Sequence, residues 1–166
     1  SSAGGSDAGG DGSVCSPYAT VAYAEAHAAR GSDGLAMVGS FEVESDYKFT
    51  TGFSYTGFGD ATELTLYNGR VAMQSNAFAR MVINANKGSS LDAYYTFKGN
   101  GLQLYNVVIE HEASSYATNE ILYVSGCDDP FLTVENSLLY DDEYNALVYN
   151  EEGCEETTTV AKSVSA

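Results

Sequence analysis

Three short stretches of the chain repeat one alternation of apolar and polar residues that ends in asparagine. They read LTLYN at 64–68, LQLYN at 102–106 and LTVEN at 132–136. Every second side chain of a β-strand points to the same face, so each stretch predicts a strand with one buried face. The recurrence indicates a structural unit that the chain builds several times.

The residues around each pentapeptide recur as well. An apolar strand that ends in a glycine turn precedes it, as in YYTFKGNG. A third short run of apolar residues follows it, as in VVIEH. Weaker copies lie on either side, and the equivalent apolar positions are separated by 23, 38, 30 and 26 residues. Periods of about 20 to 50 residues are typical of solenoids, propellers and repeat arrays. The equivalent positions are Val43, Leu66, Leu104, Val134 and Val160.

We therefore expect an all-β chain that forms a short parallel β-solenoid over about residues 37–164. Each unit holds about three short strands without room for a helix, which suits a β-helix coil better than a propeller blade of about 40 residues. The longest interval contains FARMVINANKGSSLDA, which is interpreted as an insertion or an extra partial coil. The alternative is an antiparallel, pilin-like β-sandwich whose strands share only their β composition.

Stacking predicts which residues lie above one another. Coils of a solenoid are about 4.8 Å apart, so Leu66, Leu104 and Val134 are expected to form one inward column. Asparagine tolerates left-handed backbone, and its amide can bond the next coil. A ladder at a turn is therefore expected from Asn68, Asn106 and Asn136.

This pattern resembles the Asn-laddered right-handed β-helix of the pectate-lyase-like superfamily. The resemblance implies calcium-binding acids and a basic residue that abstracts a proton, for which the arginines are Arg30, Arg70 and Arg80. Enzymes of that superfamily have more coils and long active-site loops, which this chain lacks. The departure favours a chain without catalytic activity, and we predict no catalytic residues.

The N-terminal part differs from the repeats. Residues 1–15 are a Gly/Ser/Asp leader that predicts a flexible tether, and residues 16–166 are expected to form a single domain. Ser16 is a candidate N-cap, Pro17 suits the first helical position, and Gly31 ends an Ala-rich run. A helix over about 17–30 is therefore expected to cap the first coil.

The net charge of the chain limits the kinds of molecule that it can bind. Seven Lys and Arg against 23 Asp and Glu give a formal net charge of −16, so phosphate backbones and anionic membrane surfaces would be repelled. No apolar run approaches the roughly 20 residues of a transmembrane segment. We predict two kinds of partner, copies of the chain itself and extracellular glycans that stack on its many tyrosines.

Two of the three cysteines occur in matched contexts, SGCDD and EGCEE, one repeat apart. Stacked coils would bring them within disulfide reach, which predicts a Cys127–Cys154 bridge and an oxidising, extracellular compartment. Cys15 is then left over as a candidate intermolecular thiol.

Acidic residues form several short runs. Calcium takes hard oxygen ligands, so the weak calcium candidates are Asp128, Asp129, Asp141, Asp142 and Glu143, although acidic runs in turns are usually solvated faces. His27 and His111 lie in no catalytic arrangement, and no cofactor is predicted.

The leading functional hypothesis is an extracellular structural protein that assembles into a filament, a pilus-like fibre or a surface layer. The alternative is an adhesive module that binds glycans or a surface, and a polysaccharide lyase or hydrolase ranks third.

Overall fold

The computed structural model describes residues 4–28, 34–43, 47–59, 62–67, 71–74, 76–87, 95–111, 120–124, 132–141, 148–150, 158–161 and 164–165. In these ranges the chain forms one short helix and is otherwise mostly strand, which confirms the predicted all-β class. None of the described helical residues makes a segment long and apolar enough to span a membrane.

The single helix α1 spans Val21–His27 and precedes all of the strands. The strands are β1 (Gly34–Met37), β2 (Ser40–Val43), β3 (Ser54–Gly57), β4 (Glu63–Tyr67), β5 (Val71–Gln74), β6 (Ala77–Lys87), β7 (Tyr95–Asn100), β8 (Leu102–His111), β9 (Glu120–Val124), β10 (Leu132–Glu135), β11 (Leu138–Asp141), β12 (Val148–Asn150), β13 (Thr158–Ala161) and β14 (Val164–Ser165).

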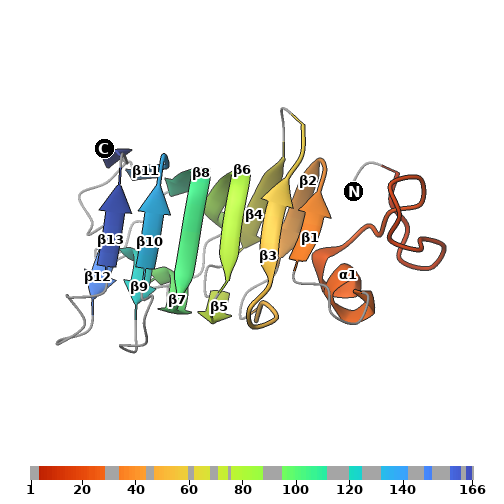
Figure 1. The fold of residues 1–166 in the computed structure, drawn as a ribbon, viewed down its shortest axis with the longest axis horizontal. Coiled ribbons are helices and arrows are strands. Elements are labelled where there is room, and N and C mark those ends of the chain that lie inside the picture. Colours follow the sequence, from red (N-terminus) through yellow and green to blue (C-terminus); the bar gives the residue numbers. More distant parts are fainter. Residues whose placement is uncertain are drawn as a thin grey trace.

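All pairs between these strands are parallel, which rules out the antiparallel sandwich for the described part of the chain. The first row of the larger sheet runs β1-β3-β6-β8-β10-β13 and forms the front layer of Figure 1. In the second row β2 pairs with β4, β4 with β6, β8 with β11, and β11 with β14.

The long strands β6 and β8 belong to both rows, so the sheet curls where they bend. Their first halves pair in the first row and their second halves pair in the second row. A separate four-stranded parallel sheet has the order β12-β9-β7-β5.

The core lies between the rows and consists of side chains in register. In the first row Tyr55 pairs with Phe78, Phe78 with Leu104, and Leu104 with Val134, and all four are fully buried. In the second row Leu64 pairs with Ile83 and Ile83 with Ile109. Aromatic residues fill the first units, where the Tyr55 and Phe78 rings stack at a centroid distance of 5.0 Å.

The predicted column is correct for two of its three members. Leu104 pairs with Val134, and Val134 pairs with Val160. Leu66 instead pairs with Val43 in the second row, and Phe78 occupies the level next to Leu104 in the first row. Both rows carry the same two-residue alternation, so the pentapeptide pattern could not distinguish them. FARMVIN belongs to the central strand β6, which pairs on both sides, so of the two interpretations the extra coil agrees with the structure and the insertion does not.

The corner between the rows uses left-handed backbone. Arg80, Asn106 and Asn136 have φ values of 58°, 53° and 49°, and each ends the first-row part of its unit. Asn68 lies outside the described residues, so the predicted asparagine ladder stays a prediction. One level earlier the backbones approach closely, because a Cβ on Gly57 would lie 2.1 Å from the Arg80 carbonyl oxygen.

The predicted helix over about 17–30 is too long at both ends, because α1 begins at Val21 and its C-cap is Ala28. Thr20, and not Ser16, is the N-cap, and its hydroxyl accepts a hydrogen bond from the Tyr23 N–H. The backbone before it bonds the N-terminal loop, because the Pro17 carbonyl accepts from the Ser6 N–H. α1 lies beside β1 at one end of the sheet, and Val21 belongs to the core (Figure 1).

Replacing Asn106 tests the corner. Asn106→Ala should lower the free energy of unfolding by about 1 kcal/mol, because alanine pays a steric penalty at positive φ. Asn106 is exposed, so little packing is lost. Urea denaturation followed by circular dichroism measures the change. Asn106→Gly is the control and should stay within about 0.5 kcal/mol of wild type; equal losses for both variants would contradict the account.

Candidate functional site

The two ends of the stacked strands are the candidate functional surfaces. At the first end, residues 6–20 form hydrogen-bonded turns, and the flexible tether stays a prediction. The Ser6 N–H donates to the Pro17 carbonyl at 3.0 Å, and the Asp11 N–H donates to the Ser16 carbonyl at 2.9 Å. These hydrogen bonds hold the loop against the residues that precede α1.

Asp7 joins the loop to the start of the helix. Its carboxylate accepts hydrogen bonds from the Ala19 N–H at 2.8 Å, the Thr20 N–H at 3.0 Å and the Thr20 hydroxyl at 2.7 Å. Desolvation by itself would raise the pKa of Asp7, but these hydrogen bonds and the charge of His27 outweigh it. The pKa of Asp7 is consequently lowered from its ordinary value of 3.8.

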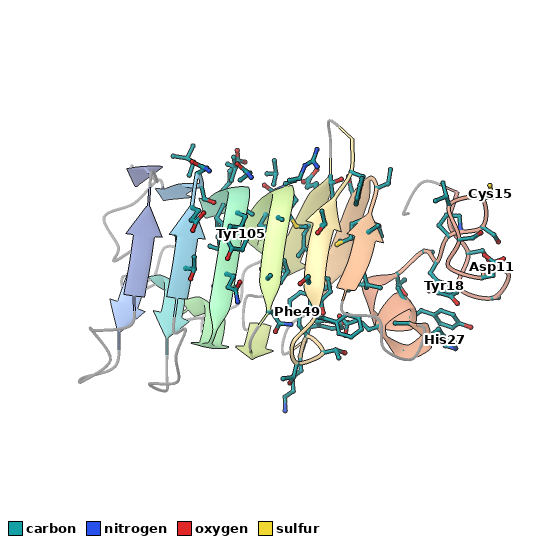
Figure 2. The ribbon with its side chains drawn as sticks, in the orientation of Figure 1. Asp11, Cys15, Tyr18, His27, Phe49 and Tyr105 are labelled. Atoms are coloured by element: carbon teal, nitrogen blue, oxygen red, sulfur yellow. The ribbon has the colours of Figure 1, made fainter. Side chains whose placement is uncertain are left out.

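The loop carries an exposed thiol. Cys15 is free and exposed, and the neighbouring Val14 side chain is 98% exposed. Figure 2 shows Cys15 at the outer tip of the loop, away from the strands. The thiol is accordingly open to contact with another molecule.

Glu25 fastens the helix to the strands. Its carboxylate accepts hydrogen bonds from the Thr50 N–H and hydroxyl, at 3.1 and 2.7 Å, and from the Tyr55 hydroxyl at 2.8 Å. Desolvation, together with hydrogen bonding to the nearby Glu25, raises the pKa of Tyr55 and of Tyr47 far above the ordinary value of 10.0. Both phenols therefore stay protonated as donors, which closes this end firmly.

A cavity of about 310 Å³ lies between the loop, the helix and β1. Tyr18 and His27 line its outer side, and Val21, Met37 and Phe41 line its inner side. His27 stacks on Tyr23 with ring centroids 3.8 Å apart, and its Nδ1 lies 2.9 Å from the Tyr23 carbonyl oxygen. These contacts give His27 a packing role at this end.

The opposite end is a row of strand edges. Among the described residues, β12 pairs only with β9, β13 only with β10, and β14 only with β11. These strands lie at the end of the molecule farthest from α1 (Figure 1). An edge of this kind offers N–H and C=O groups that a further strand can pair with.

The remaining candidates from the sequence are only partly described. Cys127, Cys154, Asp128, Asp129, Asp142 and Glu143 lie outside the described residues, as do Arg30 and Arg70. Asp141 ends β11 and pairs with His111 in the backbone register. Within the described ranges no three acidic, histidine or cysteine residues gather into a metal-binding group. The disulfide and the calcium site stay predictions.

Sequence reasoning missed Asp7, Glu25 and Arg80 as structural determinants. Asp7 and Glu25 act on residues 12 to 30 positions away, and no local motif marks such pairs. Arg80 is exposed at positive φ, and its guanidinium carbon lies 6.0 Å from the centroid of the Phe58 ring. Its only signal is the alternation of FARMVIN, which by sequence alone is interpreted as part of an insertion or of an extra partial coil.

Comparisons with known proteins do not assign the chain to a family. No protein-family model matches it, and neither a curated protein nor a solved structure matches.

Acidification tests the Asp7 linkage. A folded pKa below the unfolded value means that Asp7 stabilises the loop above about pH 3.8, and that this contribution disappears as the pH falls through the lowered folded pKa. In an acid titration followed by NMR, the Ala19 and Thr20 N–H groups should lose their hydrogen bonds to Asp7 as the pH falls. Asp7→Asn should remove this step, whereas Asp11→Asn should retain it; an unchanged step in Asp7→Asn would refute the linkage.

Proposed function

We propose that the protein is an extracellular structural subunit, built as a short parallel β-solenoid, that assembles with copies of itself. The parallel rows, the in-register core columns and the second parallel sheet support a solenoid whose units are successive coils. Each coil of this proposal contributes strand residues to the first and second rows, and four of the six coils also contribute a strand to the smaller sheet.

The observation that carries this proposal is the contrast between the two ends. Val21 packs in the core, and Glu25 and Asp7 fix the helix and loop over the first strands. The described strands β12, β13 and β14 at the other end are each paired on one side only, as β1, β2 and β5 are, but no described helix lies beside them. Strand addition at such an edge supplies affinity through main-chain hydrogen bonds.

This contrast determines the kind of assembly. Because the first end is covered, the open edge of one molecule meets the open edge of another, which gives a two-fold contact. Cys15 supplies a second two-fold contact at the opposite end. Two Cys15 thiols would form a disulfide while giving two protons and two electrons to an extracellular oxidant. Two different two-fold contacts at opposite ends alternate into a linear filament.

Charge opposes this assembly and makes it sensitive to salt. Each copy carries a formal charge of −16, so two copies repel one another at low ionic strength. Salt at physiological concentration screens exposed charges beyond about 8 Å. Assembly should therefore strengthen with ionic strength, in contrast to association driven by opposite charges.

Proline substitutions along β13 test the edge. In a parallel strand, alternate N–H groups point to opposite neighbours, so two of the four single variants at Thr158, Thr159, Val160 and Ala161 remove only outward donors. The two variants that remove outward donors should keep the thermal midpoint but abolish edge pairing between molecules. The two that remove inward donors should destabilise the fold. Light scattering in oxidising buffer at high salt measures the assembly, and a wild-type protein that stays monomeric there would refute the proposal.

Cys15→Ser is the matched variant for the other end. It should stop the assembly at dimers without changing the thermal midpoint, and reductant should do the same to the wild type. Filaments of unchanged length would show that Cys15 is not a junction.

A second function, an adhesive glycan-binding module, is supported by Tyr105. Its neighbours Leu104 and Val107 are buried, so Tyr105 points outward, next to Ala79 on one side and Glu135 on the other. The Tyr105 hydroxyl donates to Gln103 Oε1 at 2.9 Å, which holds the ring along its own strand. Such a ring beside a small residue can support a sugar by stacking.

Glycan-array binding distinguishes this second function from assembly. Selective binding by the wild type that falls at least about tenfold in Tyr105→Ala, with folding intact, would support it. Ala36→Ser, on the outward face of β1, is the control and should bind like the wild type. Binding that survives Tyr105→Ala would reject this site.

A further inference from the structure

An exposed apolar surface follows the corner between the two rows. The described part of the chain has four exposed large apolar side chains, and three of them belong to this region. Val38 is 50% exposed, Phe58 is 48% exposed and Leu138 is 36% exposed. Apolar side chains that gather on one face, unlike scattered ones, mark interaction sites.

The backbone register places these residues in two groups, one at the corner and one on the outward face of the second row. The Phe58 N–H donates to the Met37 carbonyl at 2.9 Å, so Phe58 lies one level from Val38 at the corner. On the second row Val82 pairs with Val108, and Val108 pairs with Leu138. Met81, Ile83, Val107 and Ile109 are buried, so the side chains between them point outward.

We call Val38, Phe58, Val82, Val108 and Leu138 the apolar ridge. It crosses five successive levels, from the corner in the first two to the outward face of the second row in the last three. Levels of a parallel sheet are about 4.8 Å apart, so the ridge is about 20 Å long, the length of about six residues of extended chain.

Arg80 stands at the corner on the same level as Val82. Its guanidinium carbon lies 6.0 Å from the Phe58 ring centroid, a distance at which a cation and an aromatic ring attract. This contact places the charge of Arg80 on the Phe58 side, toward the first end of the sheet.

Carboxylates border the ridge along its length. Glu63 occupies the level before Val82 in the same outward column, and its Oε1 accepts a hydrogen bond from the Asn84 amide. Glu110 is exposed on β8, two residues after Val108, and Glu42 is exposed on β2. Glu135 borders the corner on β10. Arg80 is the cation that the structure describes in this region, so the border is strongly acidic.

We propose that the apolar ridge binds an extended, cationic polypeptide segment of another protein, with alternate apolar side chains on the ridge and basic side chains on its acidic border. In an extended chain every second side chain points to the same face, and these side chains are about 6.6 Å apart. Alternating apolar residues therefore reach successive parts of the ridge. A second copy of this protein fits poorly, because its formal charge of −16 repels the same border.

A synthetic peptide that alternates lysine and valine over about eight residues is the probe, and fluorescence anisotropy measures its binding. The wild-type protein should bind it at low salt, and about 0.5 M salt should weaken the binding at least tenfold. A peptide with glutamate in place of lysine should not bind. Equal binding of both peptides would overturn the proposal.

Variants locate the site. Leu138→Ser should weaken binding about tenfold, since burial of a leucine side chain on association is lost. Glu110→Gln should weaken it about threefold at low salt and leave it unchanged at high salt. Ala36→Ser, on the outward face of β1, should bind like the wild type. If Leu138→Ser fails to fold, Val108→Thr replaces it and keeps the shape of the side chain.

The remaining outcomes are equally decisive. Wild-type affinity in both Leu138→Ser and Glu110→Gln would place peptide binding elsewhere and reject the ridge. Dimers that form at high salt and disappear in Leu138→Ser would show that the ridge binds a second copy, which also contradicts the proposal.

Discussion

In-register parallel pairing is the constraint on which the rest of this structure depends. Each unit places its strands directly above those of the unit before, so side chains of equivalent positions meet along two inward columns. Tyr55, Phe78, Leu104 and Val134 share one column, and a change of volume at one level is felt at the next. The same pairing leaves a backbone edge at the last strand, which carries the proposed assembly.

The first end is protected by polar contacts between distant residues rather than by a large apolar cap. α1 has seven residues, which is too short to be stable by itself. Thr20 caps it, Asp7 holds Thr20, and Glu25 reaches the Thr50 and Tyr55 hydroxyls. Strands paired on one side only lie at both ends of the described part, β1, β2 and β5 at one and β12, β13 and β14 at the other, and the ends differ because α1 and the N-terminal loop pack beside the first strands.

The acidic surface influences the proposed contacts in opposite ways. A charge of −16 weakens the contact between identical copies and strengthens the contact with a cationic segment at the apolar ridge. Salt should therefore promote self-assembly and weaken ridge binding. Both contacts can coexist, because the ridge follows the corner between the rows whereas the edges lie at the end of the stack.

The sequence by itself determined the β class, the repeat and the pairing of Leu104 with Val134, because a two-residue alternation and repeated spacing are local properties. Only the tertiary structure decided that Leu66 belongs to the second row and that Phe78 stacks beside Leu104. Both rows show the same alternation, so register depends on where the chain turns its corner. The helix boundary, the ordered loop and the apolar ridge depend on contacts between distant residues, which no local pattern encodes.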